Sequence, residues 1–305
     1  NTDGGGNPDR AVFLVADLLS RARVNPDNLN PIDPMTMPEL LKRLFLPTLL
    51  LTLLLVNSCS EDPSGPGGDP PPSDSVTTVI PQIDTVFLHD NTAFTQGLLF
   101  QNGRLFESTG LNGASSLREV DPESGAILRR VDLPDLYFGE GLAYHNGRLY
   151  QLTWRNGVAF VYDPDNFAVL DTLSYSGEGW GLTSDGVSLI MSNGTADITF
   201  RDEAFAAERT IRVRVDGMSV SRLNELEYAN GRIYANVWLT DTILEIDPED
   251  GAVQRVIDAS SLTAIEAPTA SGAVLNGIAF YPERNTFWLT GKLWSRMFEV
   301  RLDGG

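Results

Sequence analysis

Cysteine and histidine are almost absent from this chain of 305 residues. Cys59 is its one cysteine, and His89 and His145 are its two histidines. A single cysteine rules out an internal disulfide framework, and two histidines argue against a histidine-based zinc site. Any catalysis must therefore use carboxylates, amides, lysine or bound ions.

Positive charge is also scarce. Lysine and arginine number 22 against 41 aspartates and glutamates, which gives a net charge of -19 and a pI near 4.4. Nucleic-acid binding needs clustered basic residues to displace counterions, and the sequence contains no basic run. We therefore expect no nucleic-acid partner. The composition, with 42% hydrophobic, 9% aromatic and 21% charged residues, is typical of a globular protein.

One long hydrophobic run is present, at residues 44–56. It is too short for a comfortable transmembrane span, and the two basic residues directly before it are typical of a signal peptide. The Val-Asn-Ser-Cys string that follows resembles a bacterial lipobox. We interpret residues 37–58 as a lipoprotein-type signal peptide and Cys59 as the lipid attachment site. The alternative is an ordinary signal peptide in which Cys59 is removed or idle.

The segments on either side of this signal do not have the composition of a folded core. We expect residues 1–36 not to be part of the mature protein. Residues 59–76 are rich in proline, glycine and acidic residues, and this composition predicts a disordered tether. A diacylated cysteine is enough for stable anchoring. We therefore expect residues 77–305 to form a monomeric domain that is exported and lipid-anchored in the bacterial cell envelope, facing the periplasm or the surface.

Five repeated units follow. In three of the units an Asn-Gly pair typical of a type I′ hairpin separates the first two strands, and an Asp-Pro turn precedes a fourth strand. The units start 44, 40, 44 and 52 residues apart, at Leu98, Leu142, Leu182, Leu226 and Ile278. Four antiparallel strands at a period of about 45 residues make one blade of a β-propeller.

The predicted fold is all-β, a five-bladed β-propeller closed by an N-terminal strand. The fifth unit ends after three strands, at residues 298–302, whereas residues 77–88 are strand-like and precede the first unit. These residues are expected to supply the missing outer strand, which would close the ring and remove exposed edges. The alternative is a β-sandwich or an open meander, although neither usually shows so regular a turn repeat.

A polar side chain stands directly before each apolar inner strand, usually beside a glycine. In a propeller these positions meet at one mouth of the central channel, so we expect them to converge: Gln96, Glu140, Glu178, Asn224 with Glu225, and Asn276. Tryptophans recur nearby, at Trp154, Trp180, Trp238 and Trp294, the last close to Lys292. Such a pocket suits a small polar ligand with an apolar flank.

Each of these residue types also has an ordinary structural explanation. Tryptophans in repeats often pack between blades, and a Gly-Glu-Gly string can be a tight turn with a solvated acid. Lys292 can be a surface lysine, and Asn224 and Asn276 can cap turns. The sequence patterns leave these alternatives open.

The motifs together resemble the plant and bacterial type of glutaminyl cyclase, the glutaminyl-peptide cyclotransferase family, whose fold is a five-bladed propeller. The matching strings include Phe-Thr-Gln-Gly at 94–97, Phe-Gly-Glu-Gly at 138–141, Gly-Glu-Gly-Trp-Gly-Leu at 177–182, Leu-Asn-Glu-Leu-Glu at 223–227 and Thr-Gly-Lys-Leu-Trp at 290–294. They span all five units in the order of the family. The resemblance does not extend to the first 76 residues.

The resemblance implies cyclisation of an N-terminal glutaminyl residue of a peptide or protein to pyroglutamate with loss of ammonia. It also implies a set of active-site residues: Phe94, Gln96, Phe138, Glu140, Trp154, Trp180, Asn224, Trp238 and Lys292. Glu140 is the leading catalytic candidate, as a proton shuttle, with Glu178 and Glu225 as its rivals. Gln96, Asn224 and Lys292 are candidate donors to the oxyanion, and the aromatic residues would shape the pocket.

No cofactor is expected to be required. The family suggests a structural calcium ion in the central channel, but the sequence has no calcium-loop motif. Two other functions remain open because fold does not determine function. One is a propeller outside the cytoplasm that binds a ligand without chemistry, and the other is a metal-dependent hydrolase of the lactonase kind.

Overall fold

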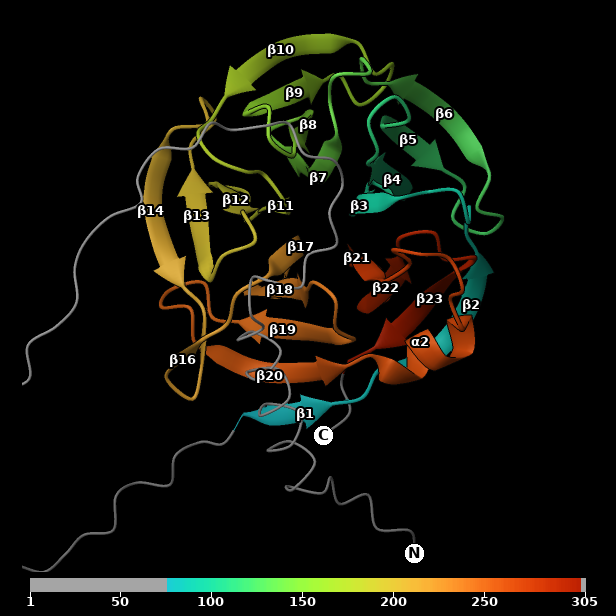
Figure 1. Ribbon diagram of the computed structural model, residues 1–305, viewed down its shortest axis with the longest axis vertical. Helices are drawn as coiled ribbons and strands as arrows, with labels where there is room; N and C mark the ends of the chain where they lie inside the picture. The colour runs from blue at the N-terminus through green and yellow to red at the C-terminus, as the bar shows by residue number, and fades with distance from the viewer. Residues whose placement is uncertain (1–75, 303–305) are drawn as a thin grey trace, which may run out of the picture. The chain divides into compact units, whose positions relative to one another are not determined.

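Residues 76–302 are described by the computed structural model, and most of them lie in five β-sheets arranged around a common centre (Figure 1). Each of these five sheets is one blade, and the first strand of each repeated unit lies innermost. Blade 1 consists of β3 (Thr95–Gln101), β4 (Arg104–Thr109), β5 (Ser116–Val120) and β6 (Ile127–Asp132). Blade 2 consists of β7 (Gly139–His145), β8 (Arg148–Thr153), β9 (Val158–Tyr162) and β10 (Val169–Ser174).

The other three blades repeat this order. Blade 3 consists of β11 (Leu182–Ser184), β12 (Leu189–Ser192), β13 (Asp197–Arg201) and β14 (Ala207–Arg212). Blade 4 contains β17 (Leu223–Ala229), β18 (Arg232–Val237), β19 (Thr242–Ile246) and β20 (Val253–Asp258). Blade 5 contains β21 (Leu275–Tyr281), β22 (Thr286–Gly291) and β23 (Arg296–Arg301). The prediction of a five-bladed propeller is confirmed.

Two short elements connect blades. A hairpin of β15 (Arg214–Val215) and β16 (Met218–Ser219) lies between blades 3 and 4 in the sequence. Helix α2 (Ser260–Glu266) lies between blades 4 and 5 and is the one helix among residues 76–302. No helix in this part of the chain is long and apolar enough to cross a membrane. The interpretations of residues 1–36, of the signal peptide, of Cys59 and of the tether up to residue 75 concern residues outside the described range.

The Asn-Gly pairs form the predicted turns between the first two strands of a blade. Asn102, Asn146 and Asn230 have φ of 52, 46 and 52°, and the glycines that follow them have φ of 72, 81 and 75°. A type I′ turn needs positive φ at both central residues, which asparagine and glycine tolerate best. This turn fixes the register between the inner strand and its neighbour.

The segment before the first blade contributes to two different blades. Strand β2 (Gln82–Leu88) pairs antiparallel with β23 and is the outer strand of blade 5. Strand β1 (Thr77–Val79) instead pairs parallel with β20 and adds a fifth strand to blade 4. The expectation that all of residues 77–88 belong to the last blade is therefore wrong for β1. Pro81 separates the two strands, because it lacks the N–H that a continuous ladder would need.

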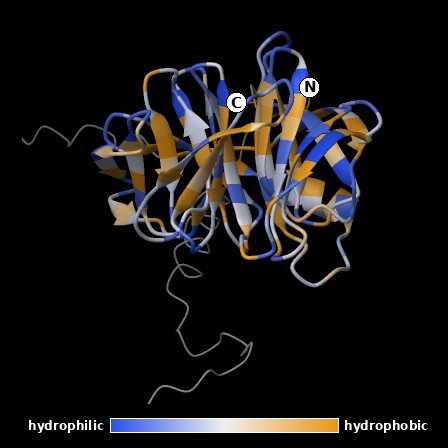
Figure 2. Cartoon of the chain, turned by 90° about the horizontal axis from the view of Figure 1, so that it is seen from above, coloured by the Kyte–Doolittle hydropathy of each residue, from blue (hydrophilic) through white to orange (hydrophobic). Residues whose placement is uncertain are grey.

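The core is divided among the interfaces between blades. Five apolar clusters fill them, and each cluster takes its buried side chains from two neighbouring blades. The cluster between blades 5 and 1 shows the pattern: it contains Leu98 and Leu105 from one blade and Trp288 and Met297 from the other. Hydrophobic and hydrophilic residues alternate along many strands in Figure 2, as expected for sheets that bury side chains against their neighbours.

Glycines lie where neighbouring inner strands come closest. A Cβ at Gly97 would lie 2.6 Å from the backbone nitrogen of Leu142 in blade 2. A Cβ at Gly181 would lie 2.0 Å from the backbone oxygen of Asn224 in blade 4. Such contacts are far inside van der Waals distance, so the inner strands can meet around the channel only if these positions have no side chain.

We predict that Gly97→Ala destabilises the protein by about 1–3 kcal/mol or more, because the backbone of blade 2 cannot move away without disturbing the ring. The matched control is Gly103→Ala in the same blade. Gly103 has no atom within 4 Å of its ideal Cβ position but a φ of 72°, so alanine there should cost only the left-handed backbone penalty of about 1–2 kcal/mol. Urea unfolding of both variants measures the difference. A smaller loss for Gly97→Ala than for the control would contradict the close-approach argument.

Candidate active site

Bulges start the inner strands of four blades. The pairing register shifts between Thr95 and Gly97, between Gly139 and Leu142, between Leu223 and Leu226, and between Leu275 and Ile278. A bulge leaves an extra residue outside the ladder and redirects its side chain. The polar residues that were expected to precede these strands therefore lie at the first residues of the strands, inside the bulges. In blade 3, Glu178 lies in the loop before β11.

Three of these bulge residues form a hydrogen-bonded chain. Gln96 Nε2 donates to Glu140 Oε1 at 3.2 Å. Asn276 Nδ2 donates to the backbone oxygen of Thr95 at 2.9 Å and to Gln96 Oε1 at 3.4 Å. Because Gln96 Oε1 accepts from Asn276, its amide nitrogen is turned towards Glu140. The predicted convergence of blades 1, 2 and 5 at one mouth is thus observed.

Glu140 lies at one end of this chain and is only 5% exposed. The peptide group that follows it is held at both its polar atoms, by a hydrogen bond from Ser108 Oγ to the Glu140 carbonyl and by one from the Gly141 N–H to the carbonyl of Trp180. Burial raises the pKa of Glu140 well above its usual value. The charge of Lys292 opposes this shift, and that of Glu178 adds to it. The explanation of Glu140 as a solvated acid in a turn is therefore wrong.

Lys292 is also buried, with 5% of its surface exposed. It follows β22, and its ammonium nitrogen lies 5.0 Å from the centre of the Phe94 ring. Burial lowers the pKa of Lys292 to about 8, against the opposing charge of Glu140. The segment is held against blade 1 by a 2.7 Å hydrogen bond from the Leu293 N–H to the backbone oxygen of Ala93. Lys292 is therefore not a surface lysine.

Aromatic rings continue from Phe94 along the mouth. Phe94 and Phe138 pack edge to face at 6.1 Å between ring centres, and Phe138 lies 5.6 Å from Trp154. Trp180 and Trp238 form a second edge-to-face pair at 5.4 Å. All five rings are partly exposed, as expected for rings that face a ligand. Trp294, by contrast, is fully buried in the cluster between blades 4 and 5, so the structural explanation holds for it.

Glu178 connects the two aromatic groups. Its Oε2 accepts hydrogen bonds from Trp154 Nε1 and from Trp180 Nε1, both at 2.9 Å, and its Oε1 accepts one from Arg155 Nε at 2.9 Å. Partial burial works to raise the pKa of Glu178, but these hydrogen bonds outweigh it and the pKa is lowered. Glu178 is thus ionised, and it holds both indole rings in place by hydrogen bonds. Sequence reasoning missed Arg155, and nothing but its place after Trp154 could have indicated it.

Glu225 has a different task. It occupies the position that is glycine in the other four blades, at Gly97, Gly141, Gly181 and Gly277. It is fully buried, and it accepts the backbone N–H of Leu98 at 3.2 Å and that of Ile278 at 2.9 Å. The carboxyl group therefore joins blades 4, 1 and 5 at the channel. The break in the glycine pattern was the sequence signal for this structural function.

Asn224 lies in the bulge of blade 4 and is 2% exposed. Its Oδ1 has no hydrogen-bond partner among the described residues, and the same is true of Asn276 Oδ1. Unpaired buried acceptors are costly and uncommon in folded proteins. Two such atoms in the bulges of adjacent blades indicate a site prepared for a hydrogen-bonding ligand rather than residues that only cap turns.

Calcium binds six to eight oxygen ligands, and the suggestion of a structural calcium ion in the channel stays a prediction. Within residues 76–302, no three histidines, cysteines, aspartates or glutamates form a group that could hold a metal ion.

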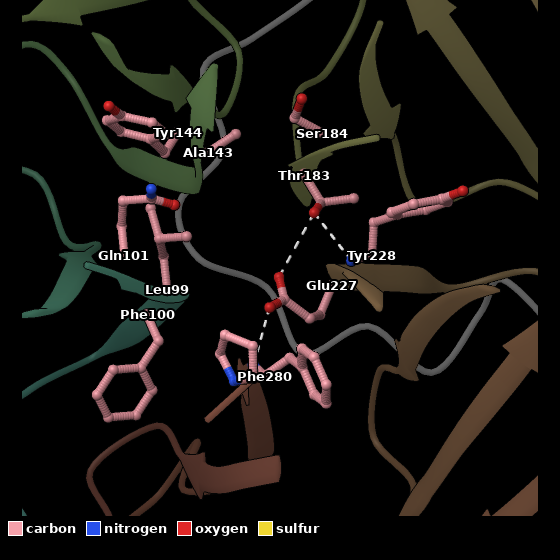
Figure 3. A pocket seen from close by; sticks show the side chains of 11 residues that line it. Leu99, Phe100, Gln101, Ala143, Tyr144, Thr183, Ser184, Glu227, Tyr228 and Phe280 are labelled. Carbon is pink, nitrogen blue, oxygen red and sulfur yellow. Dashed lines mark hydrogen bonds between the residues drawn. The ribbon is translucent and has the colours of Figure 1, made fainter. Parts of the chain in front are cut away.

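A separate cavity of about 190 Å³ lies at the other end of the channel (Figure 3). It is lined by the last residues of the five inner strands, whereas the site above lies at their first residues. Figure 3 shows the Glu227 carboxyl group between Thr183 and Phe280. Glu227 accepts the Phe280 N–H at 2.8 Å and the Thr183 hydroxyl at 3.5 Å. Burial raises the pKa of Glu227 to about 8.

Comparisons with known proteins agree on one family. A family model described as glutamine cyclotransferase matches residues 50–302. A glutaminyl-peptide cyclotransferase from Arabidopsis thaliana is 39% identical over 231 residues, which cover 73% of this chain and 72% of that protein. The crystal structure of Myxococcus xanthus glutaminyl cyclase is similar with a TM-score of 0.72 and 43% identity, over 75% of this chain and 99% of that chain.

Glu227 generates a prediction about stability and pH. In the folded protein Glu227 retains its proton up to about pH 8, whereas in the unfolded chain it releases the proton near its usual pKa of 4.5. The contribution of Glu227 to stability is therefore full below pH 4.5 and declines as the pH rises to about 8. Relative to the wild type, Glu227→Gln should become more stable by on the order of 3–5 kcal/mol between pH 4.5 and 8.5.

The measurement is urea unfolding of both proteins at several pH values. Groups that titrate in both proteins cancel in the difference, and glutamine adds only a constant offset. A difference that does not change with pH would show that Glu227 is ionised in the folded protein throughout.

Proposed function

The chain belongs to the glutamine cyclotransferase family, and we propose that it cyclises the N-terminal glutaminyl residue of a peptide or protein to pyroglutamate, with Glu140 moving the proton. The observation that carries this assignment is Glu140 itself, a buried carboxyl group with a raised pKa that lies near a buried lysine and behind a partly exposed aromatic wall. The family resemblance of the motifs is confirmed by the comparisons.

The reaction is an intramolecular acyl transfer. The α-amine of the substrate attacks the γ-carbonyl carbon of the same residue, a C–N bond forms, and the C–N bond to the departing amide nitrogen breaks to release ammonia. Because the nucleophile is already tethered, the protein mainly has to select the folded-back conformer. One proton must leave the attacking amine and one must reach the departing nitrogen, since a free amide anion is a very poor leaving group.

Glu140 is suited to both transfers. A carboxyl group whose pKa is raised towards the working pH can take a proton and return it at comparable cost. Gln96 donates to one of its oxygens and so fixes its orientation, while the other oxygen is left for the substrate. The rivals are unsuited, because three donors hold Glu178 ionised and backbone N–H groups occupy both oxygens of Glu225.

Lys292 and the amide N–H groups of Gln96 and Asn224 are the donors that can stabilise the oxyanion. Lys292 brings a positive charge in a site of low dielectric, where charge stabilisation of a tetrahedral intermediate is most effective. Gln96 retains a second N–H beside the one given to Glu140, and Asn224 has an unpaired amide oxygen that suits the substrate amine. Trp154, Trp180 and Trp238 enclose the methylene groups of the glutamine side chain, and the open mouth lets the peptide chain leave.

Two other functions have less support. A binding module would not need a buried carboxyl group and a buried lysine whose pKa values are both shifted towards neutrality, a combination that marks catalytic sites. A lactonase-like hydrolase would need a channel metal, and residues 76–302 hold no group of three His, Cys, Asp or Glu residues that could bind one.

We extend the proposal to the cellular context on the sequence alone. Residues 37–58 act as a lipoprotein-type signal peptide, and Cys59 carries the lipid. The propeller is then a monomer held by a short tether to a membrane of the bacterial cell envelope, where exported peptides and proteins are its substrates, and it has no nucleic-acid partner. Labelling with a radioactive fatty acid, with Cys59→Ser as control, tests the anchor.

Replacing Glu140 tests the central assignment. Glu140→Gln should fold normally and lose at least about 100-fold in kcat, because an amide cannot exchange the proton. The assay mixes the purified protein with a Gln-initiated peptide and follows ammonia release and the mass change of the peptide, with the spontaneous rate subtracted. Glu178→Gln is the matched control. It keeps an acceptor for the indoles, so its smaller loss should appear mainly in KM.

Two outcomes would count against this assignment. An unchanged kcat in Glu140→Gln removes Glu140 from the mechanism. No turnover by the wild type above the spontaneous rate favours the binding module.

The pKa of about 8 for Lys292 predicts the pH profile. The substrate amine must be neutral, so kcat/KM should rise towards about pH 8. Lys292 must be protonated to stabilise the oxyanion, so kcat/KM should fall above about pH 8. In Lys292→Arg the guanidinium stays charged, and the alkaline limb should move to higher pH at a lower maximal rate. Lys292→Ala should lose more activity than Lys292→Arg. An alkaline limb at the same pH in Lys292→Arg would assign it to another group.

A further inference from the structure

His89 lies behind the active site in a buried group of charged residues that the mechanism above does not use. It follows β2, the strand that completes blade 5, and its side chain is only 1% exposed. The group also contains Glu107 on β4, Arg118 on β5 and Asp90 beside His89. Three of these side chains are buried and that of Asp90 is 25% exposed, and buried charges are costly unless their geometry is well matched.

The hydrogen bonds of the ring show its protonation state. His89 Nδ1 lies 2.8 Å from the backbone oxygen of Trp294, and Nε2 lies 3.0 Å from Glu107 Oε1. Carbonyl and carboxylate oxygens can only accept, so both ring nitrogens must donate, and only the imidazolium has two N–H groups. Glu107 is ionised, since its Oε1 also accepts the Thr95 hydroxyl at 2.7 Å and Arg118 lies 3.8 Å from its Oε2.

The charges around the ring agree with this assignment. Burial works to lower the pKa of His89, but the charge of Glu107 and the hydrogen bonds outweigh it, and the pKa is raised. Burial likewise works to raise the pKa of Glu107, but the charge of His89 outweighs it, and that pKa is lowered. Arg118 donates a hydrogen bond to Asp90 at 2.8 Å, so its positive charge near the ring is partly neutralised.

The two hydrogen bonds of the His89 ring connect two segments that carry active-site residues. Trp294 is two residues after Lys292. The backbone N–H of His89 also donates to the backbone oxygen of Ser295, the residue after Trp294, at 2.9 Å. On the other side, Glu107 holds the hydroxyl of Thr95, which directly precedes Gln96. The imidazolium therefore spans the gap between the segment that carries Lys292 and the bulge that carries Gln96.

We propose that His89, held as an imidazolium between Glu107 and the carbonyl of Trp294, is a positioning residue that sets the spacing between Lys292 and the Gln96–Glu140 pair. It does not touch the substrate. The proposal rests on the proposed cyclisation, because it assigns His89 a part in placing the groups of that reaction. A neutral imidazole would turn a bare nitrogen towards one of the two oxygens, so loss of the proton would break one of the two connections.

Two substitutions in the full-length protein separate the connections. Asparagine places its amide N–H near the position of Nδ1, so His89→Asn keeps a donor for Trp294. Glutamine places its N–H near the position of Nε2, so His89→Gln keeps a donor for Glu107 and loses the side-chain hydrogen bond to Trp294, while the backbone hydrogen bond to Ser295 stays. His145→Gln is the control, because His145 lies at the end of β7 and bonds Ser184 at the other end of the channel.

We expect kcat of His89→Gln to fall on the order of 10- to 100-fold with KM changed less than about 3-fold, since small displacements of catalytic groups act on the rate. The alkaline limb of kcat/KM should also shift, because Lys292 changes its surroundings. His89→Asn should retain more of kcat than His89→Gln, and His145→Gln should match the wild type. Ring nitrogen NMR of the wild type, with His145→Gln to assign the two histidines, should show both nitrogens of His89 protonated at pH 8.

Three results would overturn the proposal. The first is a wild-type kcat and pH profile in both His89 variants with only a lower melting temperature, which would leave His89 a structural part of ring closure. The second is a bare ring nitrogen on His89 at pH 8. The third is no turnover by the wild type, which would overturn the proposed function as well, whereas the first two leave cyclisation by the wild type intact.

Discussion

The close approach of the five inner strands is the constraint on which the rest of the structure depends. Neighbouring strands touch backbone to backbone around the channel, as at Gly181 and Asn224, where no side chain fits. A bulge before this contact takes one residue out of the ladder, so a side chain is free to point into the mouth. In this way the requirement for ring closure also presents the polar groups of the active site. Blade 4 departs from the pattern, since Glu225 replaces the glycine and its carboxyl group joins three blades by backbone hydrogen bonds.

Burial gives the site its chemistry. It raises the pKa of Glu140 and lowers that of Lys292, while the attraction between the two charges opposes both shifts. The outcome is a carboxyl group and an amine whose proton affinities are closer to each other, and to neutrality, than in water. Such a pair can exchange protons with a substrate amine at little cost. The net charge of -19 does not by itself produce this state, because exposed charges are screened by solvent and salt.

The sequence was sufficient to predict the blades, because the turns are local. An Asn-Gly pair specifies a hairpin through its own backbone preferences in three of the units, and five units with this strand pattern require a ring to bury their faces. The pairing of β1 was not predictable in the same way. An extended segment such as residues 77–79 can add to any open edge, parallel or antiparallel, and Pro81 was the one local sign of a break. Helix α2 and the β15–β16 hairpin were likewise not predicted, since neither has a counterpart in the other repeats.

The motifs predicted which residues share the mouth, but not how the glutamates divide their functions. Residue type is the same at 140, 178 and 225, and Glu140 and Glu178 both stand between two glycines. The difference lies in the donors that other parts of the ring bring to each carboxyl group. Glu178 receives three side-chain N–H groups, which keep it ionised, and Glu225 receives two backbone N–H groups, which hold it in place. In the described chain Glu140 has one donor, Gln96, and little solvent. With so few donors the Glu140 carboxyl group is not held in its ionised form, and one of its oxygens is left for the substrate. Glu140 is therefore able to transfer a proton.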